Sequence, residues 1–531
     1  MVAAVVALLP AGLLNPHTVE AAPGIMRWDT VNTPASDSNS KYDVLNPYFP
    51  SDNFTGSEIR DLAVGNDGKT LIAAVTVDGR TVNPSNGKGP LGVLFKTDNG
   101  GITWSLSAYR MLISTTGWVP GNHVYNVAMA PDAPKIWAVS VGDNLTGPRE
   151  LWVTDAAGAS WSNANVSVAW DTGEAISTLD ISQDYGNGRD FMFGTRSGTG
   201  KGKFFIRKGT AFGSWAQQQA PEPKIDYFAV RFSPTYAGDD SVVLVYADDN
   251  QTNYNVGIRD LSGNAILQYI FPDAGIEVST ADNVSPSYSS LAVADLSLPS
   301  DFSGQSEALR RAFVSLYAPG LPPGDNVTGI FRIDNTQPAA LYSTRDPYRQ
   351  VYSIAFFGTY ASGKMLVGFA NGSPCNAVVP TFYLDTPCTC AGSCIYPSLK
   401  PPTGAANQGN CGSLNPLACS DNLTGVGAAI VAWSSTGSLA YAVTGSGIIS
   451  DNTSPSWWNS DKVIGGQKHP WISTLIPNDE SAFSISRNNG DTWNQLSLID
   501  TTIDWFNDVA VSADCTTLYL ASVHRNVGIG C

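Results

Sequence analysis

One stretch of the chain decides its fold class. It reads Leu94-Phe95-Lys96-Thr97-Asp98-Asn99-Gly100-Gly101-Ile102-Thr103-Trp104, and it predicts a strand, a tight turn and a second strand that opens with the tryptophan. Short polar side chains satisfy the backbone groups of such a turn, glycine accepts a positive φ, and the tryptophan lies over the turn. Burying one tryptophan removes about 150–250 Å² from water, which stabilises the fold by about 4–6 kcal/mol.

The pattern recurs along the chain. Further copies run from Thr154 to Trp161, from Ser450 to Trp457 and from Ser486 to Trp493, and Ser214-Trp215 looks like a remnant of a fifth. These octets resemble the Asp-box, or bacterial neuraminidase repeat, whose usual form is Ser-x-Asp-x-Gly-x-Thr-Trp. In that family the box is the turn between the third and fourth strands of a β-propeller blade. The structural box residues that the resemblance implies are Asp98, Trp104, Asp155, Trp161, Asp451, Trp457, Asn488 and Trp493, with Asn99 and Asn488 at the family's Asp position and Asp98, Asp155 and Asp451 one position early.

A second pattern is an apolar strand of the form Φ-x-x-Φ-Ala-Φ, where Φ is apolar, followed by a turn and another apolar strand. Strands that are apolar on both faces are expected where a sheet lies between two neighbours. Intervals of roughly 50–80 residues are typical of blades with long loops. We therefore predict an all-β fold, a β-propeller with seven to eight four-stranded blades, eight being favoured. The copies begin at Ile59, Val124, Ile176, Tyr227, Tyr288, Val351, Ala428 and Phe506.

The domain organisation that follows is a signal peptide and one propeller. Residues 1–22 have the apolar run and small-residue cleavage zone of a signal peptide, but no basic residue precedes the run, so we expect the true start upstream of Met1. The propeller spans 28–531, with a Cys-rich insertion at 372–424 and an extra hairpin region at 464–498. Strand 28–32 would close the ring by pairing with the incomplete blade 506–531; alternatively, the natural chain continues beyond Cys531.

The eight cysteines are candidates for disulfides. An even number in an exported chain favours disulfides, and we expect them to brace the insertion. Zinc ligation by Cys388, Cys390 and Cys394 is the alternative, although a fourth ligand at the usual spacing is missing. The pairing is left open. The cysteines are Cys375, Cys388, Cys390, Cys394, Cys411, Cys419, Cys515 and Cys531.

Charge and composition exclude several classes of partner. The net charge is −16, which repels nucleic acid and anionic membranes, and the apolar run at 2–14 is too short to span a bilayer. This surface suits a secreted protein at the cell exterior. No motif indicates a cofactor; structural Ca²⁺ is compatible with the acidic surface, but no motif indicates it either. The histidines are isolated, which gives metal or triad catalysis little support.

Two pairs of residues are candidates for ligand binding. Six of the eight Φ-Ala-Φ steps carry Ala at the centre, but the third carries Asp180 and the fourth Arg231. Because equivalent positions of neighbouring blades lie close together, we expect these two near the central channel, either as a structural ion pair or as a site for an anionic or sugar ligand. Trp458 and Trp471 are candidates for stacking on sugars, with packing as the other interpretation.

Beyond the box, the layout resembles the Asp-box surface-layer-like proteins of some bacteria. The resemblance implies a non-catalytic scaffold or binding propeller of the cell envelope, which assembles laterally with itself or binds other envelope proteins or glycans. The alternative is a secreted glycoside hydrolase. A xyloglucanase-like enzyme needs two carboxylates about 5–9 Å apart, and a sialidase needs an early Arg-Ile-Pro motif, whereas Arg332-Ile333-Asp334 lacks the proline. A sortilin-like peptide-binding propeller is the third interpretation. We assign no catalytic residue.

Overall fold

The computed structural model describes the central part of the chain and short segments toward its end. The residues described are 58–78, 90–101, 103–116, 122–143, 146–186, 188–207, 215–259, 267–271, 275–279, 285–321, 325–344, 350–370, 381–384, 429–444, 482–487, 489, 494–497, 505–511 and 518–523. They fall into two units. The smaller unit contains one antiparallel hairpin, β28 (Trp505–Val511) with β29 (Leu518–Val523), and the larger unit contains the other strands.

The larger unit consists of seven antiparallel sheets, each made of strands that follow one another along the chain. The first three sheets are β1 (Glu58–Val64), β2 (Leu71–Asp78) and β3 (Pro90–Thr97); β4 (Asn122–Ala130), β5 (Ala133–Asp143), β6 (Gly147–Thr154) and β7 (Ser162–Asn163); and β8 (Ala175–Ile181), β9 (Phe191–Arg196), β10 (Phe204–Arg207) and β11 (Trp215–Gln217).

The remaining four sheets follow in the same order. They are β12 (Asp226–Phe232), β13 (Ser241–Ala247), β14 (Thr252–Arg259) and β15 (Leu267–Tyr269), with β16 (Ile276–Glu277) also on β14; β17 (Val293–Ser297), β18 (Arg311–Leu321), β19 (Asp325–Asp334) and β20 (Gln337–Thr344); β21 (Gln350–Gly358), β22 (Gly363–Ala370) and β23 (Thr381–Leu384); and β24 (Ala429–Trp433), β25 (Ala440–Thr444), β26 (Ala482–Ser486) and β27 (Asn494–Ser497).

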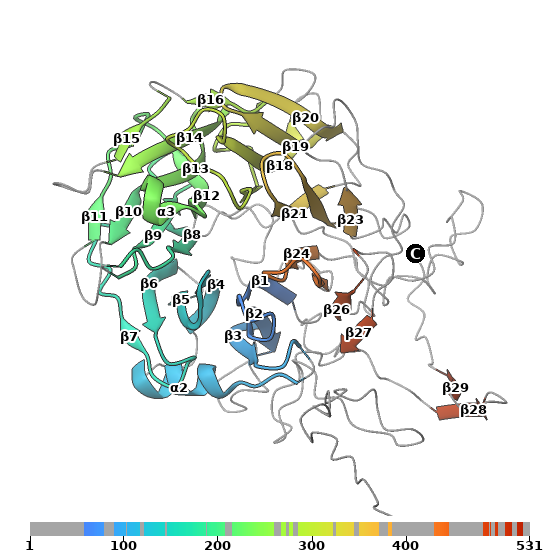
Figure 1. Ribbon diagram of the computed structural model, residues 1–531. Helices are drawn as coiled ribbons and strands as arrows, with labels where there is room; N and C mark the ends of the chain where they lie inside the picture. The colour runs from blue at the N-terminus through green and yellow to red at the C-terminus, as the bar shows by residue number, and fades with distance from the viewer. Residues whose placement is uncertain are drawn as a thin grey trace, which may run out of the picture. The chain divides into compact units, whose positions relative to one another are not determined.

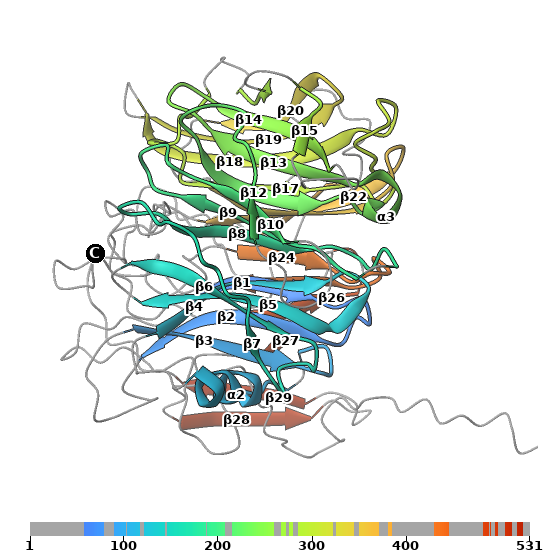
Figure 2. The ribbon, with the colours of Figure 1, turned by 90° about the vertical axis from the view of Figure 1, so that its left-hand side faces the viewer.

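The first strands of successive sheets contact one another around a ring. β1 contacts β4, and the contacts continue through β8, β12, β17, β21 and β24, which contacts β1 again. The first strand of each sheet lies nearest the centre and the later strands lie outside it (Figures 1 and 2). This arrangement is a β-propeller, so the predicted all-β propeller class is confirmed.

The number of complete blades is smaller than predicted. Five sheets have four or more strands, and in the first sheet the fourth strand is reduced to a bridge between Lys96 and Ser105, because the helix α2 (Ser107–Thr116) begins two residues later. Six sheets thus show the four-strand pattern, whereas we predicted seven to eight such blades. Since β24 contacts β1 directly, the ring of the larger unit closes without the predicted eighth blade.

Several predicted segments have a different place in the structure or fall outside the residues described. β23 lies within 372–424 but pairs with β22, so part of this predicted insertion is a blade strand. β26 and β27 lie within 464–498 and continue the sheet of β24 and β25, so they are blade strands rather than an addition. The signal peptide 1–22, the closing strand 28–32 and all eight cysteines lie outside the described residues, so the disulfide brace has no support from the structure.

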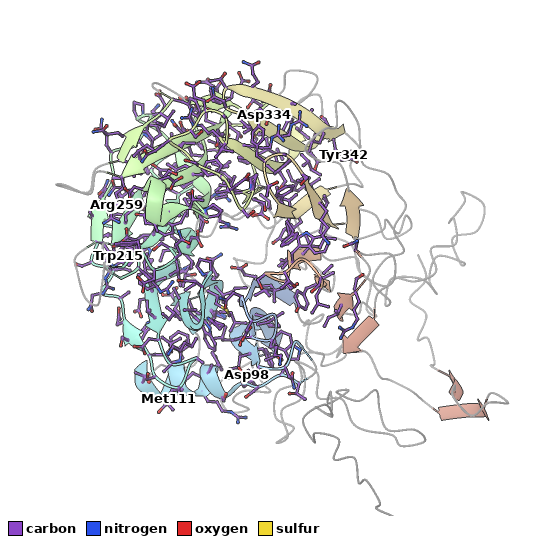
Figure 3. All side chains as sticks on the ribbon, in the orientation of Figure 1. Asp98, Met111, Trp215, Arg259, Asp334 and Tyr342 are labelled. Carbon is purple, nitrogen blue, oxygen red and sulfur yellow. The ribbon has the colours of Figure 1, made fainter. Side chains whose placement is uncertain are left out.

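Apolar side chains from facing sheets fill the space between blades (Figure 3). Phe204 and Tyr227 join the third and fourth sheets with ring centroids 5.5 Å apart, and Phe313 stacks on Phe356 between the fifth and sixth at 4.5 Å. These rings are almost fully buried, which explains why the strands are apolar on both faces. None of the helices described is long and apolar enough to cross a membrane.

The quoted turn at 97–104 is held by side chains of the turn itself. The Thr97 hydroxyl accepts the Gly101 N–H at 3.0 Å, and Asn99 Oδ1 accepts the Thr103 N–H at 2.9 Å. Gly100 and Gly101 have positive φ, and the indole N–H of the buried Trp104 donates to the Gly101 carbonyl at 3.1 Å. Asn99, rather than Asp98, makes the turn bonds.

The turn at 154–161 keeps half of this pattern. The Thr154 hydroxyl accepts the N–H groups of Ala156 and Gly158 at 3.1 and 3.0 Å, and Trp161 is buried. Asp155 is exposed, as is Asp98, which pairs with Lys96 at 3.0 Å. Of the other predicted box residues, Asp451, Trp457, Asn488 and Trp493 lie outside the described residues.

Candidate ligand site in the central channel

Four of the inner strands carry a β-bulge near their first residues. The register shifts between Ile59 and Asp61 in β1, and at the corresponding points of β8, β12 and β21. A bulge turns the following side chain away from its regular direction. In several sheets that side chain reaches the inner strand of the next sheet.

Asp295 makes the same kind of bond from β17, whose pairing has no register shift, and we call all of these hydrogen bonds the inner-strand latches. In each, a side-chain oxygen on one inner strand accepts a backbone N–H from the next, which joins two blades through their backbones. The latches are Asp61 Oδ2 with Val127 N–H at 2.8 Å, Thr178 Oγ1 with Val230 N–H at 3.2 Å, Asp295 Oδ2 with Ile354 N–H at 2.9 Å, and Ser353 Oγ with Val431 N–H at 3.1 Å.

A second row of such bonds lies two residues farther along the strands. Asp180 Oδ2 accepts the Phe232 N–H at 2.8 Å, and Ser297 Oγ accepts the Phe356 N–H at 2.9 Å. Ser297 is therefore the equivalent of Asp180 in the fifth sheet. The sequence pattern placed the centre of that inner strand at Ala292, and this assignment is wrong by five residues.

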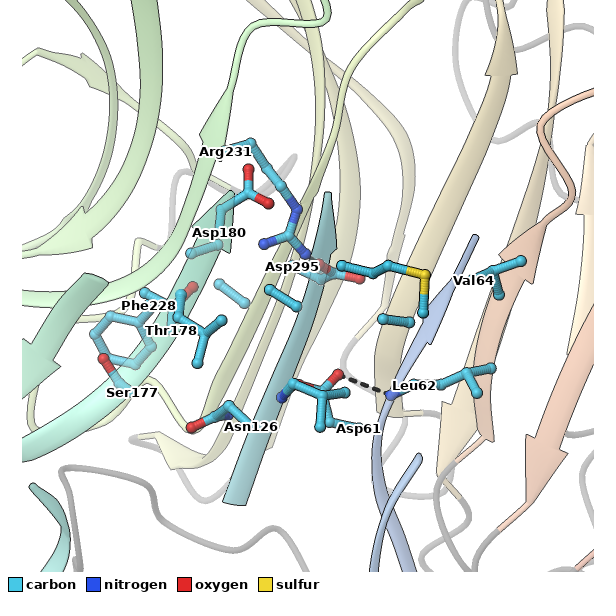
Figure 4. A pocket seen from close by; sticks show the side chains of 17 residues that line it. Asp61, Leu62, Val64, Asn126, Ser177, Thr178, Asp180, Phe228, Arg231 and Asp295 are labelled. Carbon is cyan, nitrogen blue, oxygen red and sulfur yellow. Dashed lines mark hydrogen bonds and ion pairs between the residues drawn. The ribbon is translucent and has the colours of Figure 1, made fainter. Parts of the chain in front are cut away.

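The inner strands β1, β4, β8, β12 and β17 enclose a cavity of about 320 Å³. Its charged lining consists of Asp61, Asp180, Asp295 and Arg231 (Figure 4). The guanidinium of Arg231 pairs with Asp295 through Nη2 and Oδ1 at 3.3 Å, and Nη1 donates to the Val230 carbonyl at 2.9 Å. Asp180 lies beside Arg231 in Figure 4, but the ion pair within 4 Å is the one with Asp295.

Burial and mutual repulsion shift the titration of these carboxyls. Burial raises the pKa of Asp61 to about 6; the bond from Val127 and the positive charge of Arg231 oppose the rise, whereas the charge of Asp295 adds to it. Burial likewise raises the pKa of Asp180 and of Asp295, and Arg231 opposes the rise in both. Perturbed carboxyls that converge on one cavity mark a candidate functional site.

The carboxylates are already engaged by the backbone. Asp61 accepts the N–H of Leu62 on Oδ1 and of Val127 on Oδ2, and Asp295 accepts those of Leu296 and Ile354 in the same way. These bonds hold both oxygens of each carboxyl in place. The carboxyl groups are therefore held in fixed positions around the cavity. No group of three or more His, Cys, Asp or Glu in the described part of the chain is arranged to hold a metal ion.

The two predicted binding residues on the inner strands both line this cavity, whereas Trp458 and Trp471 lie outside the described residues. Sequence reasoning missed Asp61 and Asp295. Asp61 could have been found from the sequence. It is an acidic residue directly before the apolar step Leu62-Ala63-Val64, at a position of the inner strand where a small or apolar residue is expected. Asp295 could not be found in this way because the fifth inner strand was misplaced.

No family model and no curated protein matches the chain. Similar solved structures include an ancestral GH74 enzyme, with 13% identity and a TM-score of 0.37 over 61% of this chain and 36% of that chain. A Hadza microbial sialidase has 12% identity and a TM-score of 0.37, and the match covers 60% of this chain and 65% of that chain. The β-propeller domain of the Trilobed protease from Pyrococcus furiosus has 10% identity and a TM-score of 0.39, and the match covers 83% of this chain and 98% of that chain. The match spans about a third of the GH74 enzyme. At these identities the similarity concerns the fold alone and assigns no ligand or reaction to this chain.

Proposed function

We propose that this chain is a non-catalytic binding propeller of the cell envelope and that the central cavity is its ligand site. The observation that carries the proposal is the cavity itself, in which Asp61, Asp180, Asp295 and Arg231 converge from four sheets. The envelope location is supported by the sequence: an apolar, signal-like N-terminus, sparse charge and the layout of surface-layer-like proteins. Its partners would be other copies of itself, envelope proteins or glycans.

The geometry favours binding over glycoside hydrolysis. A general acid must present its proton to the leaving oxygen, and its partner carboxylate must be free to attack or to activate water. Asp61 and Asp295 instead use an oxygen each to hold the next inner strand, at 2.8 and 2.9 Å. Moving either carboxyl during a reaction would break an inter-blade bond.

The proposal is tested with a double variant of the two oppositely charged cavity residues. Asp180→Ala/Arg231→Ala should lose binding to the ligands that the wild-type chain retains in a panel of glycans, anions and amines measured by calorimetry. A matched control is Lys224→Ala/Asp249→Ala, which removes an exposed pair of the same charges and should bind as the wild type does. Melting temperatures show whether both variants fold.

Two outcomes would contradict this proposal. One is turnover of xyloglucan or a sialoside by the wild-type chain that disappears in Asp61→Asn, because this assigns catalysis to the cavity. The other is binding that is unchanged in the double variant, because the ligand then binds elsewhere.

We also propose that the turns at 97–104 and 154–161 are Asp-boxes and that the eight cysteines form disulfides. The hydroxyls of Thr97 and Thr154 accept equivalent pairs of backbone N–H groups, which supports a common turn type. Fewer than eight free thiols in the denatured, unreduced protein are expected from thiol titration. Eight reactive thiols before reduction would contradict the disulfides.

A further inference from the structure

The joints between neighbouring sheets of the ring are held in different ways. Four joints carry an inner-strand latch, as described above. The joint between the fourth and fifth sheets is held by the ion pair of Arg231 with Asp295. Between the second and third sheets, Arg149 Nε donates to the carbonyl of Glu174, just before β8, at 3.0 Å. Six of the seven joints are therefore tied at an inner strand or by a charged side chain.

The seventh joint lacks the residue that forms a latch. We call it the seam; it lies between β24 and β25 on one side and β1 and β2 on the other. A latch requires a side-chain oxygen on the inner strand, and β24 reads AIVAW, which contains none. Ile430 stands where Asp61 and Ser353 stand in β1 and β21, directly before the apolar-Ala-apolar step. The inner strands of the other sheets each carry at least one such oxygen.

The hydrogen bonds across the seam reach one turn, residues 65–70 between β1 and β2. The Ser435 hydroxyl donates to the Asn66 carbonyl at 2.5 Å, and the Tyr441 hydroxyl donates to the Gly68 carbonyl at 2.9 Å. Both bonds join neutral groups, and such bonds stabilise less than those with an ionised partner. They therefore hold the seam at the end of β1 that leads into this turn.

Apolar packing forms the rest of the seam. Ile430 and Tyr441 belong to the same apolar cluster as Leu71 and Ile72 of β2. Burial of apolar surface is favourable but has no preferred direction, so it does not fix the backbone of β24 to that of β1 as a latch does. Proteins open locally at the places that are held least firmly, at a lower free energy than global unfolding.

We propose that the ring opens first at the seam, where β24 and β1 separate while the turn 65–70 acts as the pivot. β1 contributes residues 61–64 to the wall of the central cavity, so an open seam gives this cavity a lateral entrance. The role as an entrance rests on the proposed function, whereas the order in which the joints open does not.

Hydrogen exchange of the full-length wild type, followed by mass spectrometry, gives the first test. Backbone amides of β1 and β24 should be protected about tenfold less than those of β8 and β12, a factor that corresponds to about one hydrogen bond. β8 and β12 are the reference because Thr178 and Asp180 make two latches between them.

A cross-link across the seam gives the second test. A Cβ placed on Gly68 lies 3.8 Å from the Cβ of Ser434, which is a typical separation in a disulfide. Peptide mapping of Gly68→Cys/Ser434→Cys distinguishes the bond between these two positions from bonds of the native cysteines. The matched control is Gly68→Ser, which places a side chain of similar size at the same positive φ of 62° and cannot form the bond.

The cross-link should slow exchange in β1 and β24 about tenfold relative to the control and leave β8 and β12 unchanged. Equal protection of the four strands in the wild type would overturn the inference, and this result does not depend on how the variants fold. A cross-link that slows no strand, or all four equally, would also overturn it. These measurements involve no ligand, so the proposed function stands or falls separately by calorimetry.

Discussion

Asn99 shows how a single side chain fixes a turn in this protein. Its Oδ1 accepts the Thr103 N–H at 2.9 Å and its Nδ2 donates to the Thr103 hydroxyl at 2.8 Å. Asp98, one position earlier, is exposed and contacts Lys96. The turn is thus held by an amide, whose nitrogen donates a bond that a carboxylate cannot make.

This assignment predicts different costs for two adjacent substitutions. Asn99→Ala should lower the free energy of unfolding by about 1.5–4.5 kcal/mol, since three side-chain hydrogen bonds of about 0.5–1.5 kcal/mol each, one with Thr97 and two with Thr103, are lost. Asp98→Ala, the matched control, should change it by less than about 0.5 kcal/mol. Urea unfolding of the two variants checks this, and equal destabilisation would show that the turn is held in another way.

Asp61 links the stability of the ring to pH. Because burial raises its pKa from 3.8 to about 6, the folded state holds this proton more tightly than the unfolded state does. The contribution of Asp61 to stability therefore falls as pH rises from about 4 to about 6, and it stays constant above that range. The difference in unfolding free energy between the wild type and Asp61→Asn should follow this curve. A difference that is independent of pH, or that grows in favour of the wild type as pH rises, would contradict the raised pKa.

At the scale of elements, a buried ionic cluster joins the third and fourth sheets. Asp190, just before β9, pairs with Arg259 at the end of β14, and both side chains are fully buried. The hydroxyl of Tyr236, on the short helix α3 (Tyr236–Asp239), donates to Asp190 at 2.6 Å, and that of Tyr185 donates at 2.8 Å. Burial lowers the pKa of Arg259, and Tyr185 opposes this decrease.

Breaking this cluster from one side should be costly. Asp190→Ala leaves a buried guanidinium without its carboxylate and should destabilise the chain by about 3–5 kcal/mol. Replacing both charges, as in Asp190→Leu/Arg259→Met, should recover most of that loss because no buried charge is left unpaired. Chemical unfolding of the single and double variants completes the comparison. Losses that simply add in the double variant would mean that the two residues act independently.

The strands could be predicted from the sequence because burial of both faces leaves long apolar runs, and those runs locate the inner strands of six sheets in the larger unit. The prediction of the fifth inner strand was wrong for a physical reason. Leu291-Ala292-Val293 and Leu296-Ser297-Leu298 are similarly apolar, and it is the hydrogen bond between Ser297 and Phe356 that identifies the second segment as the inner strand. The predicted fourth strand of the first sheet is replaced by a helix that begins at Ser107. The local sequence there does not favour a strand, but it contains no residue that marks the end of one.

At the scale of the whole ring, the candidate site depends on contacts between residues far apart in sequence. Asp61 and Asp295 are separated by more than two hundred positions, and β1 meets β17 only across the channel that five sheets enclose. The sequence singled out Asp180 and Arg231 because they break an alanine pattern. It could not predict that Arg231 pairs with Asp295, since that contact follows from ring closure and not from local spacing.

The central claim is that this channel cavity is the functional site, and calorimetry of the ligand panel with the wild type and with Asp180→Ala/Arg231→Ala tests it most directly. The account predicts that a ligand bound by the wild-type chain is lost in the folded double variant, because Asp180 and Arg231 line the cavity. Binding that is unchanged in the folded double variant would contradict the account.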